Sequence, residues 1–477
     1  MKKSVIIPSV IFALAVSPKT CGQTSLTLLE CVQMAVEQNI SVDKARLEKE
    51  KSAYKITETR SSYLPQISGS GSFQNNVKLP VTMLPGDFLG QSGLYIPMKM
   101  GIRYNASVGV AVNQVLYNQT VIAGVKLSKK ADGLNALNME KTRENLAQEI
   151  ARLYFLAQTT DRQKELVSDN IARLERLAGI SKLVVDNGMG VSVDYDRIQV
   201  NLENLHTELS NTEAMHQQQL NMIKYMIEIP LETAIVLTDT VSMPLLASAP
   251  VSMSDFSNRT DIRMLAMQQD IAQMNLKMER SKYLPSLAAF GQWNYAGMRN
   301  KFGDYFKGGP MSNWYSSAAI GLSLNIPIFN GLEKRSKVQQ AKIDYRQSTL
   351  MLDNTQEYHR VNYKNAMNNY FNSRNNVERQ AQNMKLAERV YHETALKYHE
   401  GMATMSGLLQ DEAGLSSAQA GYLNALYQFK VAELDIMQLN GEIGNLMTNS
   451  TQAAQGKQAA PVTQDKADLV LVESLMY

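Results

Sequence analysis

The sequence predicts a mixed α and β membrane protein, in which four β-strands of each chain join a barrel that continues into long coiled-coil helices. Three observations support this prediction. The chain contains two copies of one pattern, four short segments alternate apolar and polar residues, and long helical segments carry coiled-coil spacing. The net charge of +3 over 477 residues is too small to indicate a nucleic-acid partner.

Residues 1–22 are predicted to be an export signal. Two lysines precede a short apolar run, and small residues precede a cleavage after Gly22. An N-terminal membrane anchor is the alternative, but it would need a longer apolar run. Cys21 leaves a lipidated N-terminus open, whereas Cys31 stands alone in the mature chain, so no intrachain disulfide framework is expected.

The two halves of the mature chain repeat one another. Three landmarks recur in the same order at nearly constant separation, which indicates an internal duplication. They are Tyr-Leu-Pro at 63–65 and 283–285, VGVAVNQVLYN and IGLSLNIPIFN at 108–118 and 320–330, and Gly-Met at 188–189 and 401–402. The predicted domains are therefore a first copy at 23–250, a second copy at 251–447 and a flexible tail at 448–477. A proline-containing linker at about 227–253 joins the copies.

Each copy opens with a helix that ends at Tyr-Leu-Pro. Proline removes a backbone donor and disfavours helical geometry at the residue before it, so Pro65 is expected to end the first helix. A strand should follow directly.

Four segments, at 66–74, 104–113, 287–295 and 318–328, alternate with a period of two. One face is apolar with aromatic residues near the strand ends, and the other is small and polar. A half-buried sandwich strand would also alternate, but four segments of roughly the nine to eleven residues that cross a bilayer favour a barrel. The predicted lumen face carries Ser68, Ser70, Ser72, Ser107, Asn113, Ser323 and Asn325.

The strand connections at 76–102 and 296–313 are rich in loop residues and are expected to face the exterior. Four strands cannot close a barrel, and an open edge in hydrocarbon leaves backbone groups unpaired. The chain is therefore expected to share its barrel with copies of itself.

The segment between residues 118 and 186 lacks proline, and a continuous helix of that length would extend about 100 Å. A coiled-coil seam runs along it from Leu146 to Val185, with a weaker second stripe beside it. The last long helix has a seam from Leu408 to Leu446 in which only Asp411 is charged. Two seams on a helix suit a cylinder in which every helix touches two others, whereas a plain coiled coil leaves the strands unexplained.

A glycine turn ends the first long helix of each copy. Gly188 and Gly401 are predicted to adopt the left-handed conformation of a helix C-cap, which makes each turn the tip of a helical hairpin. Because the strands enter at the other end, the tips should lie far from the membrane, where a partner can reach them.

In these features the chain resembles the TolC family of outer-membrane efflux proteins. The resemblance covers residues 25–447 and is carried by SLTLLECVQMAVEQN, the two Tyr-Leu-Pro segments, the Asn-x-x-x-Tyr/Phe-Asn strand exits and the glycine turns. It implies a homotrimer in the outer membrane of a Gram-negative bacterium. Three sets of four strands would form one twelve-stranded barrel, continuous with a long periplasmic tunnel of helices.

The resemblance also implies a passive exit duct of a tripartite efflux system, such as multidrug efflux, or of a type I secretion system. A periplasmic adaptor, also called a membrane fusion protein, would dock to the tips and connect the duct to an inner-membrane transporter such as an RND pump. No cofactor is implied. The docking residues would be Gly188, Met189, Gly190, Gly401, Met402 and Ala403, and the alternative is a pair of caps without partner contact.

Family members close the tunnel with acidic rings at the sixth and ninth positions after the second tip glycine. Those positions hold Gly407 and Gln410 here, and Ala403 stands where the best-known members have an arginine, so this chain departs from the familiar gate. Asp411 follows on the seam. It is either an acidic ring for cations or a solvated seam residue.

Enzymatic function is not expected. The five histidines are scattered along helical segments, and Leu396 stands where a zinc-binding His-Glu-x-x-His helix would need its second histidine. The rival function from another class is a secreted coiled-coil structural or adhesive protein without channel activity, which would be soluble without detergent.

Overall fold

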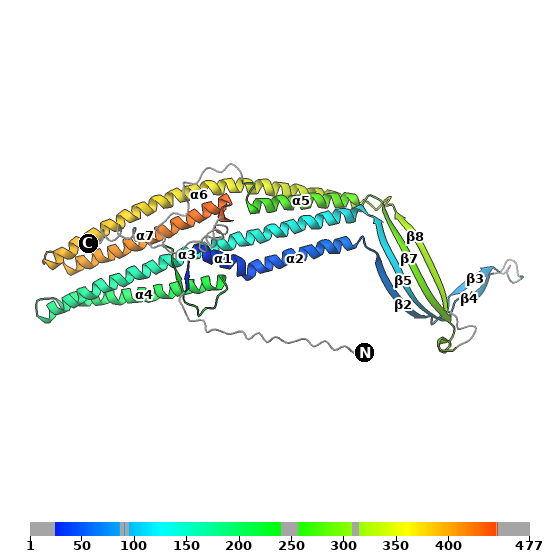
Figure 1. Cartoon of the computed structure of the whole chain (residues 1–477), viewed down its shortest axis with the longest axis horizontal. Coiled ribbons are helices and arrows are strands. Elements are labelled where there is room, and N and C mark those ends of the chain that lie inside the picture. Colours follow the sequence, from blue (N-terminus) through cyan, green and yellow to red (C-terminus); the bar gives the residue numbers. More distant parts are fainter. Residues whose placement is uncertain are drawn as a thin grey trace, which may run out of the picture. The chain divides into compact units, whose positions relative to one another are not determined.

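The computed structural model describes residues 24–85, 90, 95–239, 256–307, 314–444 and 446 (Figure 1). The elements of the first half are β1 (Thr24–Leu26), α1 (Leu28–Gln38), α2 (Ile40–Ser61), β2 (Gln66–Asn75), β3 (Val81–Pro85), β4 (Tyr95–Lys99), β5 (Tyr104–Tyr117), α3 (Gln119–Asp186), α4 (Ser192–Met226) and β6 (Ile235–Leu237). Those of the second half are α5 (Thr260–Ser281), β7 (Ser286–Arg299), η2 (Phe302–Tyr305), β8 (Trp314–Asn325), α6 (Glu333–His399) and α7 (Met405–Asn440). The predicted export signal and tail lie outside the described residues.

Two compact units make up the chain. One comprises Met1–Lys44, Glu140–Thr260 and Gln356–Tyr477, and the other comprises Ala45–Met139 and Asp261–Thr355. Each unit draws on both halves of the sequence. This division follows spatial contacts rather than the repeat, so the predicted copy boundaries stay a prediction.

The second unit contains a four-stranded antiparallel sheet in the order β2-β5-β7-β8, whose strands lie side by side in Figure 1. All four predicted strands are confirmed. The second pair differs at its ends, because β7 runs on to Arg299 and β8 ends at Asn325, so the apolar residues Ile326 and Ile328 lie beyond the strand. Asn325 pairs with Ser286, the first residue of β7, and no partner strand continues past it in the described part of the sheet.

The first strand connection contains structure that the sequence did not predict. β3 and β4 form an antiparallel pair, with Met83 opposite Pro97. Proline cannot donate to a ladder but is tolerated at a sheet edge, and this sheet consists only of edges. Pro85 and Pro97 led us to predict a loop here, but they are compatible with a short hairpin.

The helices before the sheet end as predicted. α2 and α5 each have 22 residues, and each closes with a tight turn before its Leu-Pro. The Tyr63 amide donates to the Arg60 carbonyl at 3.0 Å, and the Tyr283 amide donates to the Arg280 carbonyl at 3.2 Å. The next residue after each proline begins a strand.

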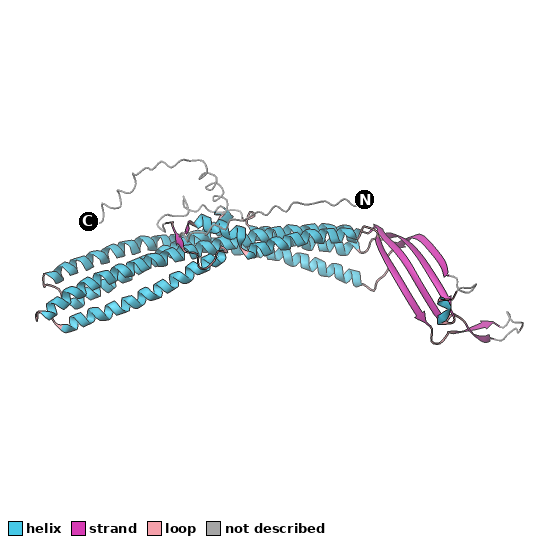
Figure 2. Cartoon of the chain, turned by 60° about the horizontal axis from the view of Figure 1, so that its bottom comes forward, coloured by secondary structure: helices cyan, strands magenta, loops and turns pink. Residues whose placement is uncertain are grey.

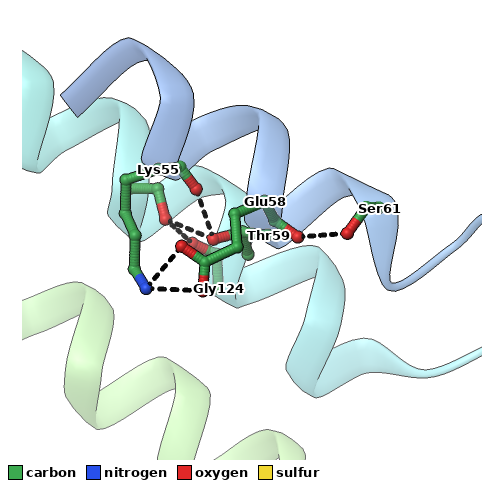
Figure 3. A network of polar contacts seen from close by, with 6 residues as sticks. Lys55, Glu58, Thr59, Ser61 and Gly124 are labelled. Atoms are coloured by element: carbon green, nitrogen blue, oxygen red, sulfur yellow. Dashed lines mark hydrogen bonds and ion pairs between the residues drawn. The ribbon is translucent and has the colours of Figure 1, made fainter. Parts of the chain in front are cut away.

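Small polar side chains hold α2 against α3 (Figure 3). The hydroxyls of Thr59 and Ser128 lie 3.0 Å apart, and Ser128 also donates to the Gly124 carbonyl at 3.0 Å. A Cβ on Gly124 would contact the Thr59 methyl at 3.6 Å, so the helices meet closely there. On the exposed side of α2, Lys55 pairs with Glu58 at 2.7 Å, an ion pair of small energetic value.

The first unit consists mainly of helical hairpins, drawn in cyan in Figure 2, in which α3 lies beside α4 and α6 beside α7. α3 and α6 have 68 and 67 residues, and α4 and α7 have 35 and 36. The continuous helix predicted for 118–186 is confirmed. Most of its predicted seam is buried, including Ile150, Ala157 and Leu174.

A buried cluster surrounds α1. Cys31, Val32 and Ala35 pack against residues of α3, α4 and α7. Burial raises the pKa of the Cys31 thiol to about 12, so the thiol is protonated and unreactive at neutral pH. The Tyr154 hydroxyl donates to the Leu26 carbonyl at 3.0 Å and thereby anchors β1.

β1 pairs in parallel with β6, which lies inside the segment predicted as a linker. No helix in the described part of the chain is long and apolar enough to cross a membrane.

Candidate functional site

The sheet has one polar and one apolar face. Cross-strand register places Ser70 opposite Gly109, Asn113 opposite Phe290, and Ser323 opposite Ala288, all on one side. The seven residues predicted to line a lumen therefore share a single face, and the hydroxyls of Ser72 and Ser107 lie 2.8 Å apart across it.

The opposite face is apolar and uncovered within the chain. Ile320 is 91% exposed, and Leu322, Leu324, Ile67, Val108 and Trp293 are exposed beside it. Leaving so contiguous an apolar surface in water would be unfavourable, so this face is suited to contact with lipid or protein.

Aromatic rings gather where the sheet meets its loops. Phe73 contacts Phe302 with ring centroids 5.7 Å apart, and Tyr295 stacks on Trp314 at 5.2 Å. The Tyr305 hydroxyl donates to the Gly297 carbonyl at 2.9 Å, which fixes η2 against the sheet. Aromatic side chains with polar tips are typical of the boundary between hydrocarbon and water.

The two hairpin tips share one backbone motif. The amides of Gly188 and Met189 donate to the carbonyls of Val185 and Val184 at 2.9 and 3.0 Å, which is a Schellman motif. Gly401 and Met402 make the equivalent bonds at 3.0 and 2.7 Å. The φ angles of the glycines, +71° and +74°, confirm the predicted left-handed caps.

Both tips present an exposed methionine. Met189 is 77% exposed and Met402 is 68% exposed, whereas Met405, three residues further on, is buried in a cluster with α3 and α4. At the first tip a Cβ on Gly190 would lie 3.0 Å from the Val184 side chain, a tight contact that would require the valine to shift slightly. Ala403 takes the matching place at the second tip.

The predicted gate residues lie on the first turns of α7. The Gly407 amide donates to the Thr404 hydroxyl at 3.2 Å, so Thr404 caps the helix and Gly407 is its third residue. Gln410 lines a groove of about 470 Å³ between α4 and α7, together with Asp196 and Arg197. Asp411 is half-buried on the same helix.

The neighbouring Glu412, which the sequence did not single out, forms a buried link between the two hairpins. Its carboxylate accepts from Arg173 of α3 at 3.2 Å, and the Arg173 guanidinium lies 5.7 Å from the ring centre of Tyr391 on α6. Burial raises the pKa of Glu412, and the charge and hydrogen bond of Arg173 oppose that rise. The link therefore joins α3, α6 and α7.

His216 of α4 lies 3.4 Å from the Asp161 carboxylate of α3, beside a cavity of about 960 Å³. Burial lowers the pKa of His216, and the Asp161 charge opposes that change. In the described residues no group of three or more His, Cys, Asp or Glu side chains is placed to hold a metal ion.

Comparison with known proteins gives one consistent result. The family model described as outer membrane efflux protein matches residues 31–227 and 256–442. Outer membrane protein TolC of Salmonella enteritidis is 20% identical over 492 residues, which cover 98% of this chain and 93% of that protein. TolC of Escherichia coli (strain K12) is 20% identical over 481 residues, which cover 97% and 90%.

Solved structures agree in fold. The outer membrane protein VceC of Vibrio cholerae superposes with a TM-score of 0.67 at 14% identity, covering 87% of this chain and 96% of that one. The CmeC outer membrane channel of Campylobacter jejuni gives 0.70 at 15% identity, covering 91% and 89%. The arrangement of strands and hairpins is thus that of these outer membrane proteins.

Proposed function

Because the chain belongs to the outer membrane efflux protein family, we propose that it forms the outer-membrane exit duct of an efflux or type I secretion system. The duct is passive, and substrates enter it from a periplasmic adaptor and an inner-membrane transporter such as an RND pump. Its place is the outer membrane of a Gram-negative bacterium, with a large periplasmic portion. Catalysis plays no part in this proposal.

The observation that carries the proposal is the two-faced sheet. Its apolar face is exposed, and its polar face carries mainly serine, asparagine, glutamine and small residues, as a wall between lipid and water requires. The outer strands β2 and β8 are edges within one chain. In hydrocarbon these edges need partners, so we propose that three copies close a twelve-stranded barrel, edge to edge.

The matching order and nearly equal lengths of α2, α3 and α4 and of α5, α6 and α7 support the proposed duplication. Towards the tip, the second stripe of α3 leaves Ile180 and Val184 exposed in the single chain, whereas Leu156, Leu166 and Leu177 are half-buried. Such a stripe suits a neighbouring hairpin from another copy, as in a cylinder of helices.

We assign adaptor docking to the tips. Two exposed methionines on rigid Schellman turns offer an adaptable apolar contact. For the gate we favour Asp411, with Gln410 and Gly407 beside it, because three copies would set one carboxylate each around the same level of the tunnel. In that case Asp411→Asn reduces cation preference in the conductance experiment below, whereas unchanged preference assigns Asp411 to solvation only.

The duct is tested by fractionation followed by conductance. The full chain, expressed with its signal, is expected in the outer-membrane fraction as a detergent-extracted trimer that conducts ions in planar lipid bilayers. A soluble, non-conducting product would establish the secreted coiled-coil alternative instead. Deletion of the gene that encodes this chain, followed by a survey of the compounds that become toxic to the cells, then identifies the substrates.

A further inference from the structure

One large aromatic side chain lies on the polar face of the sheet. Phe290 of β7 is opposite Asn113 of β5 and Gly321 of β8, and therefore shares a face with the serine and asparagine residues proposed to line the duct. Its side chain is 41% exposed. The apolar residues of the other face are proposed to contact lipid, whereas the Phe290 ring lies on the face proposed to line the water-filled duct.

The Phe290 ring packs over a glycine of the neighbouring strand. A Cβ added to Gly321 would lie 2.7 Å from Cζ of Phe290 and 2.9 Å from Cε1, so only glycine lets the ring lean over β8. An aromatic ring above a strand glycine also shields backbone and stabilises a sheet. Stabilisation of the sheet would therefore be a sufficient explanation for the Phe290–Gly321 pair if the strands needed the ring in order to pair.

The first half of the sheet shows that the ring is dispensable for pairing. Ser70 is opposite Gly109 in the same antiparallel register in which Phe290 is opposite Gly321. Ser70 and Phe290 are each the fifth residue of their strand. Over Gly109 the space is taken by the amide oxygen of Asn294, 3.0 Å from the position of a Cβ, so the equivalent site is polar.

The remainder of the polar face is electrically neutral. Its side chains on β2, β5, β7 and β8, all fully described strands, are Ser, Gln, Asn, Gly and Ala with Val115, Met298 and Tyr315 near the strand ends, and none carries a charge. Such a wall neither attracts nor repels ions. Phe290 adds a partly exposed aromatic ring among small neighbours, including Ala288, Ala319 and Gly321.

We propose that Phe290, seated on Gly321, is a contact site for flat aromatic solutes, including aromatic cations, on the inner wall of the duct. The inference rests on the proposed function and deepens it, because it names a substrate class and the residue that distinguishes it. Three copies place three such rings at one level of the barrel. Stacking and cation–π attraction then retard aromatic solutes relative to aliphatic ones of equal charge.

The test uses the full-length protein in planar bilayers, with ethidium as the aromatic cation and tetraethylammonium as the aliphatic one. With the wild-type protein, ethidium should interrupt the current for longer than tetraethylammonium does. Phe290→Ser, which reproduces the Ser-Gly pair of the first half, should shorten the ethidium interruptions by about twofold to fivefold, the loss of an exposed cation–π contact. Tetraethylammonium should be unaffected.

Two further variants separate the aromatic ring from its bulk and from its place. Phe290→Leu keeps an apolar cover over Gly321 and should behave like Phe290→Ser, whereas Phe73→Ser, on the apolar face, should leave the ethidium interruptions unchanged. If the serine variant conducts and holds ethidium as long as the wild type, the ring only covers Gly321 and the inference is wrong while the duct stands. A wild-type protein without conductance would overturn the duct and this inference together.

Discussion

The sheet and the helical hairpins handle apolar side chains in opposite ways. On the sheet, Ile320 and its neighbours on the same face are exposed within the chain. In the hairpins, Ile150 of α3 and Ile198 of α4 are fully buried by helices of the same chain. In both regions the sequence places apolar residues on one face, with a period of two in the strands and coiled-coil spacing in the helices.

The difference reflects the solvent for which each region is built. Lipid chains are as apolar as leucine, so a lipid-facing sheet needs no protein cover, whereas helices in water gain stability only by covering one another. Both patterns predict which side chains share a face. Neither pattern states what covers that face, and the structure decides this only for the hairpins.

The largest effect is expected from removing a side chain that the hairpins cover. Leu174 is 2% exposed in a cluster of α3, α4 and α7, so Leu174→Ala should cost about 4 kcal/mol through lost burial and a residual cavity. The measurement is the urea midpoint of the helical circular dichroism signal. Leu183→Ala, at a 65% exposed position of the same helix, is the matched control and should change stability by less than about 0.5 kcal/mol. Equal losses would mean that the seam is not the source of stability.

For the apolar face of the sheet, which the chain leaves uncovered, the expected damage comes from adding a charge rather than from removing an apolar side chain. Ile320→Lys should cost about 3 kcal/mol in the membrane, because a charge on the lipid-facing side of a strand is destabilising near the bilayer midplane. The adjacent Ala319→Lys lies on the polar face, opposite Gln292, and should be nearly neutral. The readout is the temperature at which the assembled protein dissociates in detergent gels after extraction from membranes. Loss of assembly by Ala319→Lys alone would reverse the assignment of the two faces.

Much of this fold was predictable because its determinants are local. Alternation along a strand, a proline after a helix and a glycine at a left-handed turn act within a few residues, and each led to a correct element. The β1–β6 pair was missed because Thr24–Leu26 finds its partner more than 200 residues away. A three-residue strand carries no periodicity from which such pairing could be inferred.

The residues of the candidate site were also predictable where their placement depends on local pattern, and not where it depends on neighbouring elements. The seven polar strand residues were placed on one face correctly, but Phe290 went unnoticed because an aromatic residue on a polar face contradicts the pattern used to find strands. Glu412 was missed beside Asp411 for a different reason. Which of two adjacent carboxylates reaches a partner helix depends on the rotation of the helices about their axes, and heptad spacing does not determine that rotation closely enough.

The hairpins also bury charge, in the link between Arg173 and Glu412. Arg173→Ala should destabilise the hairpins by about 2 kcal/mol at pH 7.5, as the buried Glu412 carboxylate loses its charged hydrogen-bond partner. The folded-state pKa of Glu412 is already raised by burial, and losing Arg173 raises it further. The group therefore favours folding below its unfolded pKa and loses that contribution as pH rises through the folded value.

It follows that the Arg173→Ala loss should shrink as the pH is lowered from 7.5 to 5, towards the raised pKa of Glu412, because protonation removes the unpaired buried charge. Thermal melts at both pH values measure it, with Arg176→Ala, an exposed arginine one turn nearer the tip, as the control. A loss independent of pH would assign the contribution of Arg173 to its contact with the Tyr391 ring rather than to the ion pair.

The smallest expected effect separates the two hairpins from each other. Thr404 caps α7 by accepting from the Gly407 amide, whereas Val191 precedes α4 in an extended conformation without a side-chain cap among the described residues. Thr404→Ala should lower hairpin stability by about 1 kcal/mol, and Val191→Ser should raise it by a similar amount, since serine supplies the missing acceptor. Hydrogen exchange of the first-turn amides of each helix is the appropriate measurement, because fraying at a tip leaves the global melt almost unchanged. If neither substitution alters exchange, the tips are held by the Schellman turns alone, and the two hairpins are equivalent where a partner would meet them.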